Sequence, residues 1–367
     1  MKDLAEDILK KEILAYGIEL GFSIIKITSA EILEVWRQGV ELRNKQDPES
    51  SWRWEKMTAD PKELLPDARS IIAAVWSYTP YPKDFPEGIG RYSAHYREYP
   101  KARENIKKLG KFLEERGYEA IVDPPLPAKA IAHRAGIGYF GKNGLIHTKS
   151  GGSWITLHCI LTNAPLPQDE SVDKLSDCGA CRACIQACPT GAIQGDGLVL
   201  PSRCIRNYML SSDFIPVDIR DKIGLRLLGC DICQQVCPKN REALKKASLP
   251  PKEEMDVFNV SNILREWKTG LKDRMERMAA LIGKNYGRAQ KILSMAVIIA
   301  GNTKDSAYIP LLAETLNHVH PPIRGHSAWA LGKIGGDRSV EILRKALAKE
   351  KDPRVIEEIE QALSCLE

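Results

Sequence analysis

Hydrophobic positions in the first 165 residues change repeatedly between helical and strand periodicity. Residues 1–30 predict an amphipathic helix followed by a short strand at Ile24–Ile27. The continuous apolar run Ser70–Ser77 predicts a buried strand, and Lys101–Arg116 predicts an amphipathic helix. Because helices and strands alternate, residues 1–165 are expected to form one α/β domain.

Three further strands and a short helix complete this predicted domain. Tyr118–Val122 predicts a strand that runs into a proline-rich segment, and Ala128–Ala135 predicts the helix. Leu145–His147 and Trp154–Leu161 are expected to pair with each other around a turn at residues 149–152.

The pattern of residues 251–367 predicts helices only and contains an internal repeat. Ser294–Asp305 matches His326–Asp337, so the repeat spacing is about 32 residues. One helix pair per unit is typical of HEAT-type solenoids. Two units cannot bury a core alone, so they are expected to pack on the preceding helices. A packing module and a partner-binding module both remain open.

The central segment, residues 166–250, has the cysteine spacing of a two-cluster ferredoxin. Cys178–Cys188 follows C-x2-C-x2-C-x3-C-P, and Cys230–Cys237 repeats the run without its first cysteine. Cys204, which lies between the two runs, is the expected replacement. In this arrangement the fourth cysteine of each run ligates the other run's cluster.

Two [4Fe–4S] clusters are therefore predicted. The first is assigned to Cys178, Cys181, Cys184 and Cys237, and the second to Cys188, Cys204, Cys230 and Cys233. Zinc usually takes paired C-x2-C units, and disulfides require an oxidising compartment, so both alternatives are disfavoured. The remaining cysteines, Cys159 and Cys365, are expected to be buried or incidental thiols.

Composition and charge exclude a membrane protein. Charged residues make up 28% of the chain, and no apolar run reaches the length of a membrane span. The N-terminus has no signal-peptide pattern, so a cytoplasmic protein is expected.

The net charge of +5 is mild, but basic residues gather ahead of the repeat among Trp267 and Tyr286. These residues indicate either a solvated helix face or an RNA-backbone contact. They are Lys268, Lys272, Arg274, Arg277, Lys284, Arg288 and Lys291.

A glycine-rich stretch at residues 134–144 is the second candidate for chemistry. It follows a predicted helix, whereas the glycines of a Rossmann site follow a strand and open a helix. Its glycines favour close backbone approach to a large flat ligand, and a purely structural loop is the alternative.

Several segments together resemble the epoxyqueuosine reductase family, and they cover most of the chain. Reductive dehalogenases share part of this resemblance. The matching segments are DPKELLPDARSII, Val122-Asp123, RAGIGYFGKNGLI, Gly152-Ser153-Trp154, PTGAI, SRCI, GCDICQQVCP and IRGHSAWALGKIG.

The resemblance implies an α/β cobalamin-binding domain, a ferredoxin-like domain with two [4Fe–4S] clusters, and an all-α HEAT-like tail. It implies an oxidoreductase that reduces epoxyqueuosine to queuosine in tRNA, fed by an external low-potential electron donor. The family is monomeric, so a monomer is expected. The family's proton-donating acid corresponds to Asp123, and its cobalamin contacts correspond to Asn143, Ile146, Leu157 and Asp231.

The sequence departs from the family pattern around the implied pocket. A family arginine becomes Met57, a family signature becomes Tyr96–Pro100, and another arginine becomes Lys129. A glutamate beyond the Gly-Ser-Trp motif becomes His158 or Cys159. Two alternatives therefore stand beside the main hypothesis: a cobalamin-dependent reductase of a different small molecule, and an iron–sulfur electron carrier.

Overall fold

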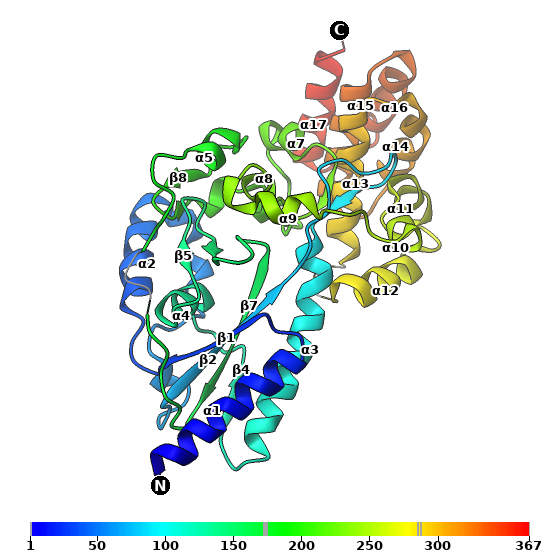
Figure 1. The fold of residues 1–367 in the computed structure, drawn as a ribbon. Coiled ribbons are helices and arrows are strands. Elements are labelled where there is room, and N and C mark those ends of the chain that lie inside the picture. The colour runs from blue at the N-terminus through cyan, green and yellow to red at the C-terminus, as the bar shows by residue number, and fades with distance from the viewer. Residues whose placement is uncertain (1, 172–174, 285, 287, 367) are drawn as a thin grey trace. The chain divides into compact units, whose positions relative to one another are not determined.

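The computed structural model describes residues 2–171, 175–284, 286 and 288–366 of the chain (Figure 1). The chain forms two compact units, each assembled from several segments. The first unit contains residues 1–80, 97–204 and 232–247, and the second contains residues 81–96, 205–231 and 248–367. The three-domain division proposed from the sequence stays a prediction.

The first unit is built on a four-stranded sheet whose order is β1-β2-β7-β4. The strands are β1 (Ile24–Ser29), β2 (Ser70–Ser77), β7 (Ile155–Thr162) and β4 (Ala120–Val122). Every neighbouring pair is antiparallel. The predicted strands at β1, β2 and β4 are confirmed. The alternation of helices and strands in the sequence did not indicate that the strands would be antiparallel.

Helices cover both faces of this sheet (Figure 1). On one face, α1 (Lys2–Glu19) and α3 (Ala94–Glu114) contribute Ile13, Ile106 and Leu109 to a core that also contains Phe22. On the other face, α4 (Ala128–Arg134) contributes Ile131, and Trp36 of α2 (Glu34–Gln46) packs against the same core. Because β2 and β7 are apolar on both faces, they occupy the centre of the sheet.

One predicted strand pairing is wrong. The short strand β6 (Ile146–His147) pairs with β5 (Tyr139–Phe140), not with β7. Only a single bridge, Thr148 to Gly152, closes the turn between β6 and β7. Instead, β7 pairs with β2 along its whole length, from Ile155 to Thr162, and β4 pairs only with its last three residues, from Ile160 to Thr162.

The cysteine-rich part of the first unit contains short elements only. They are α5 (Ala183–Ala187), β8 (Ile193–Gly195), β9 (Leu198–Val199), α8 (Ile232–Gln235) and α9 (Arg241–Lys245). This part is fastened to the sheet side of the unit through Asn240, whose Oδ1 accepts a hydrogen bond of 2.8 Å from the Ser153 N–H. The Asn240 Nδ2 donates to the carbonyl of Gln234 at 2.8 Å. The Gly-Ser-Trp motif thus holds the cysteine-rich segment against the start of β7.

The second unit is mostly helical. Its one small sheet pairs β3 (Arg91–Tyr92) with β10 (Arg226–Leu228) in parallel. The short helices α6 (Ile205–Tyr208) and α7 (Val217–Ile223) precede β10. The C-terminal helices are α10 (Lys252–Val257), α11 (Val260–Glu266), α12 (Leu271–Ile282), α13 (Ala289–Thr303), α14 (Ile309–Thr315), α15 (Pro321–Ile334), α16 (Asp337–Leu347) and α17 (Pro353–Ser364).

The predicted all-helical tail is confirmed, and its repeats stack through three helices. α13 packs against α15, and α15 packs against α17. The stacking is close because Gly301 lies against Ala330 and Gly332 lies against Ala362, where an added Cβ would approach within about 2.9 Å. Within the described residues, the structure contains no helix that could cross a membrane.

Candidate iron–sulfur and proton-transfer sites

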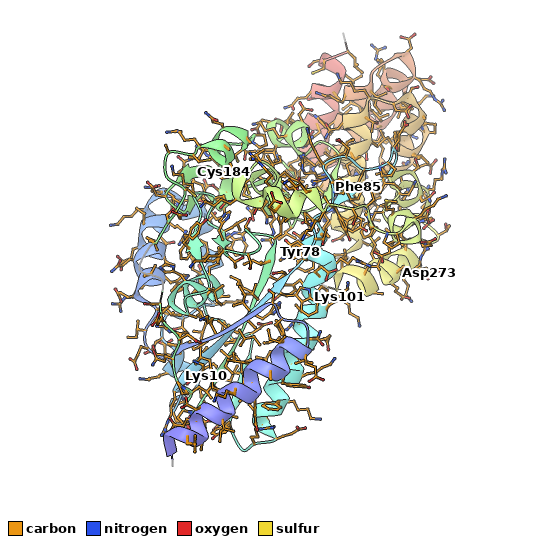
Figure 2. All side chains as sticks on the ribbon, viewed as in Figure 1. Lys10, Tyr78, Phe85, Lys101, Cys184 and Asp273 are labelled. Carbon is orange, nitrogen blue, oxygen red and sulfur yellow. The ribbon has the colours of Figure 1, made fainter. Side chains whose placement is uncertain are left out.

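Four thiols assigned to the first cluster surround one small apolar cavity. The cavity is lined by Cys178, Cys181, Cys184 and Cys237, together with Ala183 and Pro238. Cys184 lies on α5, which Figure 2 shows among all side chains. No group of three His, Cys, Asp or Glu side chains in the described part of the chain could hold a single metal ion. Thiols arranged around a cavity without converging on one point fit a cluster better than zinc.

Burial and neighbouring side chains shift the pKa values of two of these thiols. Burial raises the pKa of the Cys184 thiol, and the adjacent Cys178 and Cys237 sulfurs raise that pKa further. Burial also raises the pKa of the Cys237 thiol. The raised pKa values of Cys184 and Cys237 mean that their thiolates are disfavoured without a positive partner, so this cavity fits a group whose iron ions would neutralise them.

A lysine that the sequence motif did not identify holds the cluster loop. The backbone N–H of Lys142 approaches the Cys178 sulfur at 3.4 Å. Its ammonium group donates to the carbonyls of Gly179 at 2.6 Å and Cys181 at 3.1 Å. Lys142 therefore links the glycine-rich stretch to the first cysteine run, and its place among the glycines was the only available signal.

The second predicted set, Cys188, Cys204, Cys230 and Cys233, stays a prediction. Cys188 ends α5 with extended backbone angles, and its sulfur lies 3.6 Å from the Thr190 hydroxyl. Cys204 follows a short 3-10 turn at Pro201–Arg203. All four thiols are partly exposed.

The glycine-rich stretch folds closely on the protein's own backbone. A Cβ on Gly136 would lie 2.1 Å from the Glu170 carbonyl oxygen, and one on Gly138 would lie 2.2 Å from the His147 carbonyl oxygen. These two glycines therefore permit close approach of protein to protein, as the structural alternative expected. Nothing in this geometry requires a ligand at Gly136 or Gly138.

Asn143 and His147 lie next to each other beside the cluster cavity. The Asn143 Oδ1 accepts from Leu145 N–H at 3.3 Å and lies 3.4 Å from His147 Nε2. Burial and the charge of Lys239 lower the pKa of His147 to about 4. In the described residues, the buried Asn143 Nδ2 and His147 Nδ1 have no hydrogen-bond partner. Such orphaned groups are expensive unless a ligand satisfies them.

Two other predicted cobalamin contacts, Ile146 and Leu157, share one hydrophobic core. Ile146 is buried in it, and the partly buried Leu157 packs against it. Their neighbours in this core include Leu126 and Ile137. An apolar wall that stays partly exposed is compatible with a flat ligand, and the contact itself stays a prediction.

Asp231, the fourth predicted cobalamin contact, is engaged in a buried ion pair. Both oxygens of its carboxylate accept from Arg91, at 2.7 and 2.8 Å. The Asp231 side chain is 2% exposed and the Arg91 side chain 8%. This bidentate geometry gives Asp231 a structural role in the second unit, whatever else it contacts.

Asp123, the predicted acid, is the first residue after β4 and has a left-handed backbone with φ of 46°. Its N–H donates to the Cys159 carbonyl at 2.8 Å, and its Oδ1 accepts from the Cys159 N–H at 3.2 Å. The following residues, Pro124 and Pro125, cannot continue the ladder. An unusual φ at a non-glycine residue is typical of functional sites.

A histidine contacts this carboxyl. The Nδ1 of His158 lies 2.9 Å from Oδ2 of Asp123, and the His158 side chain is fully buried. The neighbouring thiol of Cys159 is also buried, as expected, and burial raises its pKa. No sequence pattern indicated the Asp123–His158 contact, because Asp123 follows β4 and His158 lies on β7, 35 positions farther along the chain.

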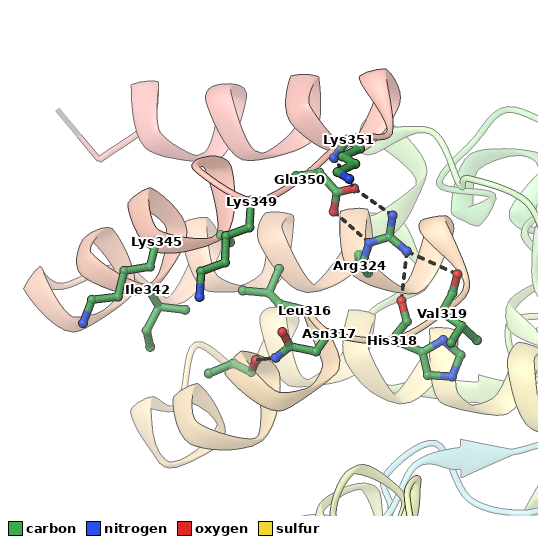
Figure 3. Close-up of a pocket in the computed structure, with 12 residues that line it drawn as sticks. Leu316, Asn317, His318, Val319, Arg324, Ile342, Lys345, Lys349, Glu350 and Lys351 are labelled. Atoms are coloured by element: carbon green, nitrogen blue, oxygen red, sulfur yellow. Dashed lines mark hydrogen bonds and ion pairs between the residues drawn. The ribbon is translucent and has the colours of Figure 1, made fainter.

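The helical tail contains a groove with a volume of about 560 Å³ (Figure 3). Lys345, Lys349 and Lys351 line one side of it and are exposed. Arg324 forms a bidentate pair with Glu350 at 2.7 and 2.8 Å. The hydrogen bonds from Arg324 lower the pKa of Glu350 to about 2. This groove was not predicted from the sequence, because its residues come from α14, α15, α16 and the loops that follow α14 and α16.

The basic residues that the sequence did identify do not form one uniform surface. Arg274 is buried and bound to Glu266 at 2.6 and 2.7 Å, so it cannot contact RNA; including it was wrong. Lys268 pairs with Glu314 and lies over the Trp267 ring. Lys284 and Arg288 are exposed.

Fold and site together define an iron–sulfur protein with a helical repeat. A family model for a 4Fe-4S double cluster binding domain matches residues 177–240, and one for HEAT repeats matches residues 287–364. The chain is 33% identical to the epoxyqueuosine reductase of Bacillus cereus over 98% of this chain and 97% of that protein. It is 28% identical to the Escherichia coli enzyme over 97% of each chain.

Solved structures agree with these relatives. Epoxyqueuosine reductase from Bacillus subtilis, with its catalytic aspartate loop swung out of the active site, superimposes with a TM-score of 0.86 at 31% identity, covering 98% of this chain and 99% of that one. An epoxyqueuosine reductase holding an epoxyqueuosine-modified tRNA-Tyr stem loop gives 0.84 at 31% identity, covering 98% of each. The chain belongs to the epoxyqueuosine reductase family.

Proposed function

We propose that this chain reduces epoxyqueuosine to queuosine in tRNA, using two [4Fe–4S] clusters and a cobalamin. The observation that carries the proposal is the full-length similarity to epoxyqueuosine reductases combined with a four-thiol cavity in the cysteine-rich segment. Removing an epoxide oxygen to leave an alkene consumes two electrons and two protons and releases water. The protein must therefore deliver both electrons and protons to one site.

Electron delivery is the role proposed for the cysteine-rich segment. Cys178, Cys181, Cys184 and Cys237 would hold one cluster, and Lys142 would stabilise its negative charge through the bonded loop. The other four cysteines, Cys188, Cys204, Cys230 and Cys233, would hold the second cluster. Electrons would enter from an external low-potential donor.

The residues beside the cluster cavity offer a hydrogen-bond donor that fits a cobalamin. Corrin side chains are amides, and the orphaned Nδ2 of Asn143 is a donor for such a group. Ile146 and Leu157 would offer an apolar wall. When bound, the group supplies an electron-rich cobalt centre for opening the epoxide. Asp231 would act by fixing the backbone between Cys230 and Cys233 through Arg91, since its own oxygens are occupied.

Asp123 is proposed as the proton donor to the departing oxygen. Its carboxyl is 17% exposed, so it is shielded from water yet reachable. Its position after β4, with a left-handed φ, aims the side chain away from the regular strand direction. General acids in such sites contribute about 10²–10⁴-fold to rate.

The helical tail is proposed to contact the tRNA backbone. Lys345, Lys349 and Lys351 place positive charge along the groove of Figure 3. Lys284 and Arg288 add exposed charge ahead of α13. RNA is held largely by such phosphate contacts, while an exposed base is recognised at the active site.

The remaining organisation follows the family. We propose three functional regions, at residues 1–165, 166–250 and 251–367, in a cytoplasmic monomer. A reductase of another small molecule stays the second candidate, because Met57, Lys129 and His158 replace family residues around the implied pocket.

The test is anaerobic turnover of epoxyqueuosine-containing tRNA by protein with reconstituted clusters, added cobalamin and a strong reductant. Nucleosides from the digested tRNA are separated and identified by mass spectrometry. The proposal predicts a product lighter than the substrate nucleoside by one oxygen atom. An unchanged nucleoside, with clusters and corrin both bound, would show that the pocket substitutions have changed the substrate.

A further inference from the structure

The imidazole of His158 has no part in the function proposed above, yet it is bonded at both ring nitrogens. Its Nδ1 lies 2.9 Å from Oδ2 and 3.2 Å from Oδ1 of Asp123. Its Nε2 lies 3.2 Å from the Thr156 hydroxyl oxygen. The ring therefore connects a buried hydroxyl to the candidate acid.

The surroundings of the ring leave it little freedom. Tyr99 of α3 covers it with ring centroids 4.9 Å apart, and Phe22 lies edge-on at 6.4 Å. On the carboxyl side, the N–H of Cys159 donates to Oδ1 of Asp123. Both oxygens of Asp123 thus face donors when the acid has lost its proton.

The titratable and charged groups around His158 are few. Asp123 approaches from the end of β4 and the phenol of Tyr99 from α3, while the thiol of Cys159 lies in the core on the opposite face of β7. Glu98 is separated from the His158 ring by further aromatic side chains. It accepts a hydrogen bond of 3.1 Å from Trp76, and Trp76 packs on Phe22. Asp123 is the one carboxyl that bonds the imidazole in the contacts described.

Hydrogen-bond chemistry fixes which nitrogen carries the proton. Asp123, as a carboxylate, can only accept, so Nδ1 must donate to it. A neutral ring then presents Nε2 as an acceptor, and the hydroxyl of Thr156 can donate to that nitrogen. Thr156 thereby favours the ring form that donates to Asp123.

We propose that His158 is a positioning residue for the acid Asp123. It donates a hydrogen bond that holds the carboxyl in place and stabilises the carboxylate left when the proton has moved to the substrate oxygen, and Thr156 fixes its tautomer. This inference rests on the proposed role of Asp123. Over the whole reaction the two carbon–oxygen bonds of the epoxide break, two electrons from the clusters and their external low-potential donor complete the alkene, and the oxygen leaves as water with two protons, the first of which comes from Asp123.

The inference follows from this chain's own departure from the family. The family glutamate beyond the Gly-Ser-Trp motif is replaced by His158 or Cys159; both side chains are buried, and Asp123 is contacted by the His158 ring and by the backbone N–H of Cys159. A strand period of two places Thr156 and His158 on the same face of β7, which is why they can act together.

The test compares four variants in the full chain with reconstituted clusters. His158→Leu removes the donor, and His158→Asn restores an amide nitrogen near the position of Nδ1. Thr156→Val removes only the hydroxyl. Thr162→Val is the matched control, because Thr162 lies on the same strand and its hydroxyl is also in a buried hydrogen bond, which it accepts from the Ala164 N–H.

We expect His158→Leu to lower kcat about 10–100-fold. It should also move the alkaline limb of the pH–rate profile upward by about one pH unit, because Asp123 loses its proton less readily without the hydrogen bond from His158. His158→Asn should recover most of both effects. Thr156→Val should change kcat and the pH–rate profile in the same directions, with effects about a third as large on a logarithmic scale. Thr162→Val should change neither quantity. A fall in kcat with an unmoved pH profile would mean a structural role only and would overturn the inference.

A second readout does not need turnover. In protein with ¹⁵N-labelled histidine, the two nitrogen shifts of His158, identified by their loss in His158→Asn, report where its proton lies. We expect the Nδ1–H form in the parent and a mixture in Thr156→Val; an Nε2–H form in the parent would refute the proposal. An active Asp123→Asn variant would instead show that the proposed acid is wrong, whereas an inactive one combined with unchanged His158→Leu kinetics would remove this inference alone.

Discussion

Arg91, on β3, donates to both carboxylate oxygens of Asp231 at 2.7 and 2.8 Å, and in this buried pair Asp231 directly follows the predicted cluster ligand Cys230 in the chain. Taking two charges out of water is costly, and good geometry repays the cost only while both partners remain. This relationship therefore makes Arg91 a stability residue next to a cluster motif.

Arg91→Leu should destabilise the protein by about 3–5 kcal/mol, because it removes the bidentate cationic partner of the buried Asp231 charge. The measurement is chemical unfolding under anaerobic conditions. Arg37→Ala is the control, since the Arg37–Glu34 pair is about half exposed on both sides. Its loss should cost less than about 1 kcal/mol. Equal effects of the two substitutions would contradict the structural role of the pair.

Cys184→Ser and Cys237→Ser should each remove the same cluster. Both thiols line the one cavity, so either variant is expected to lose about half of the iron and sulfide bound per chain. Cys365→Ser is the control, because that thiol is exposed in the helical tail. Iron and sulfide analysis, with electron paramagnetic resonance of the reduced protein, measures the effect. Full cluster content in either ligand variant would refute the assignment.

How far the sequence could predict these features depends on how local their causes are. The apolar run of β2 and the cysteine spacing are both local patterns: the strand is confirmed, and a family model for a 4Fe-4S double cluster binding domain matches the cysteine-rich segment. The pairing of β7 was mispredicted because a buried strand takes its partners from anywhere in the chain, and turn residues at 149–152 indicated only the nearest one.

The residues of the candidate site also differ in whether a local sequence pattern could identify them. Asp123 could be identified through a family motif, but its bond to His158 joins residues 35 positions apart and has no sequence signature. Arg274 resembles its solvated neighbours in sequence, and only the fold buries it against Glu266. Contacts between distant segments result from tertiary packing, and composition and periodicity do not indicate which segments pack together.

The buried histidine of the helical tail should make the second unit sensitive to acid. Burial, followed by the charge of Arg220, lowers the pKa of His326 well below its usual value of 6.5. Its ring accepts from the Ile215 N–H and bonds the Ser294 hydroxyl, so the folded state keeps it neutral. The unfolded chain binds a proton below about pH 6.5, and stability is therefore lost as the pH falls through that value.

This contribution should approach about 1.4 kcal/mol for each pH unit below 6.5. Urea midpoints measured between pH 7.5 and 5.5 test it, with His326→Asn as the comparison. The variant has no group to titrate there, so its stability should depend less on pH even if it is lower throughout. Parallel slopes for parent and variant would exclude His326 as the cause.

Charge reversal in the groove should weaken tRNA binding. Lys349→Glu with Lys351→Glu should reduce affinity for a queuosine-type anticodon stem loop and lower the salt slope by about two, if both lysines contact phosphates. The matched control is Lys107→Glu with Lys111→Glu, which makes the same change in net charge on the exposed side of α3. An equal loss in both double variants would show a general charge effect with no specific groove contact.

The most direct test of the central claim is single-turnover conversion of epoxyqueuosine in tRNA by the parent chain and by Asp123→Asn, each with and without added cobalamin. The account predicts queuosine only from the parent with cobalamin, and unchanged cluster and corrin absorbance in the variant. Product from Asp123→Asn, or product without cobalamin, would contradict it.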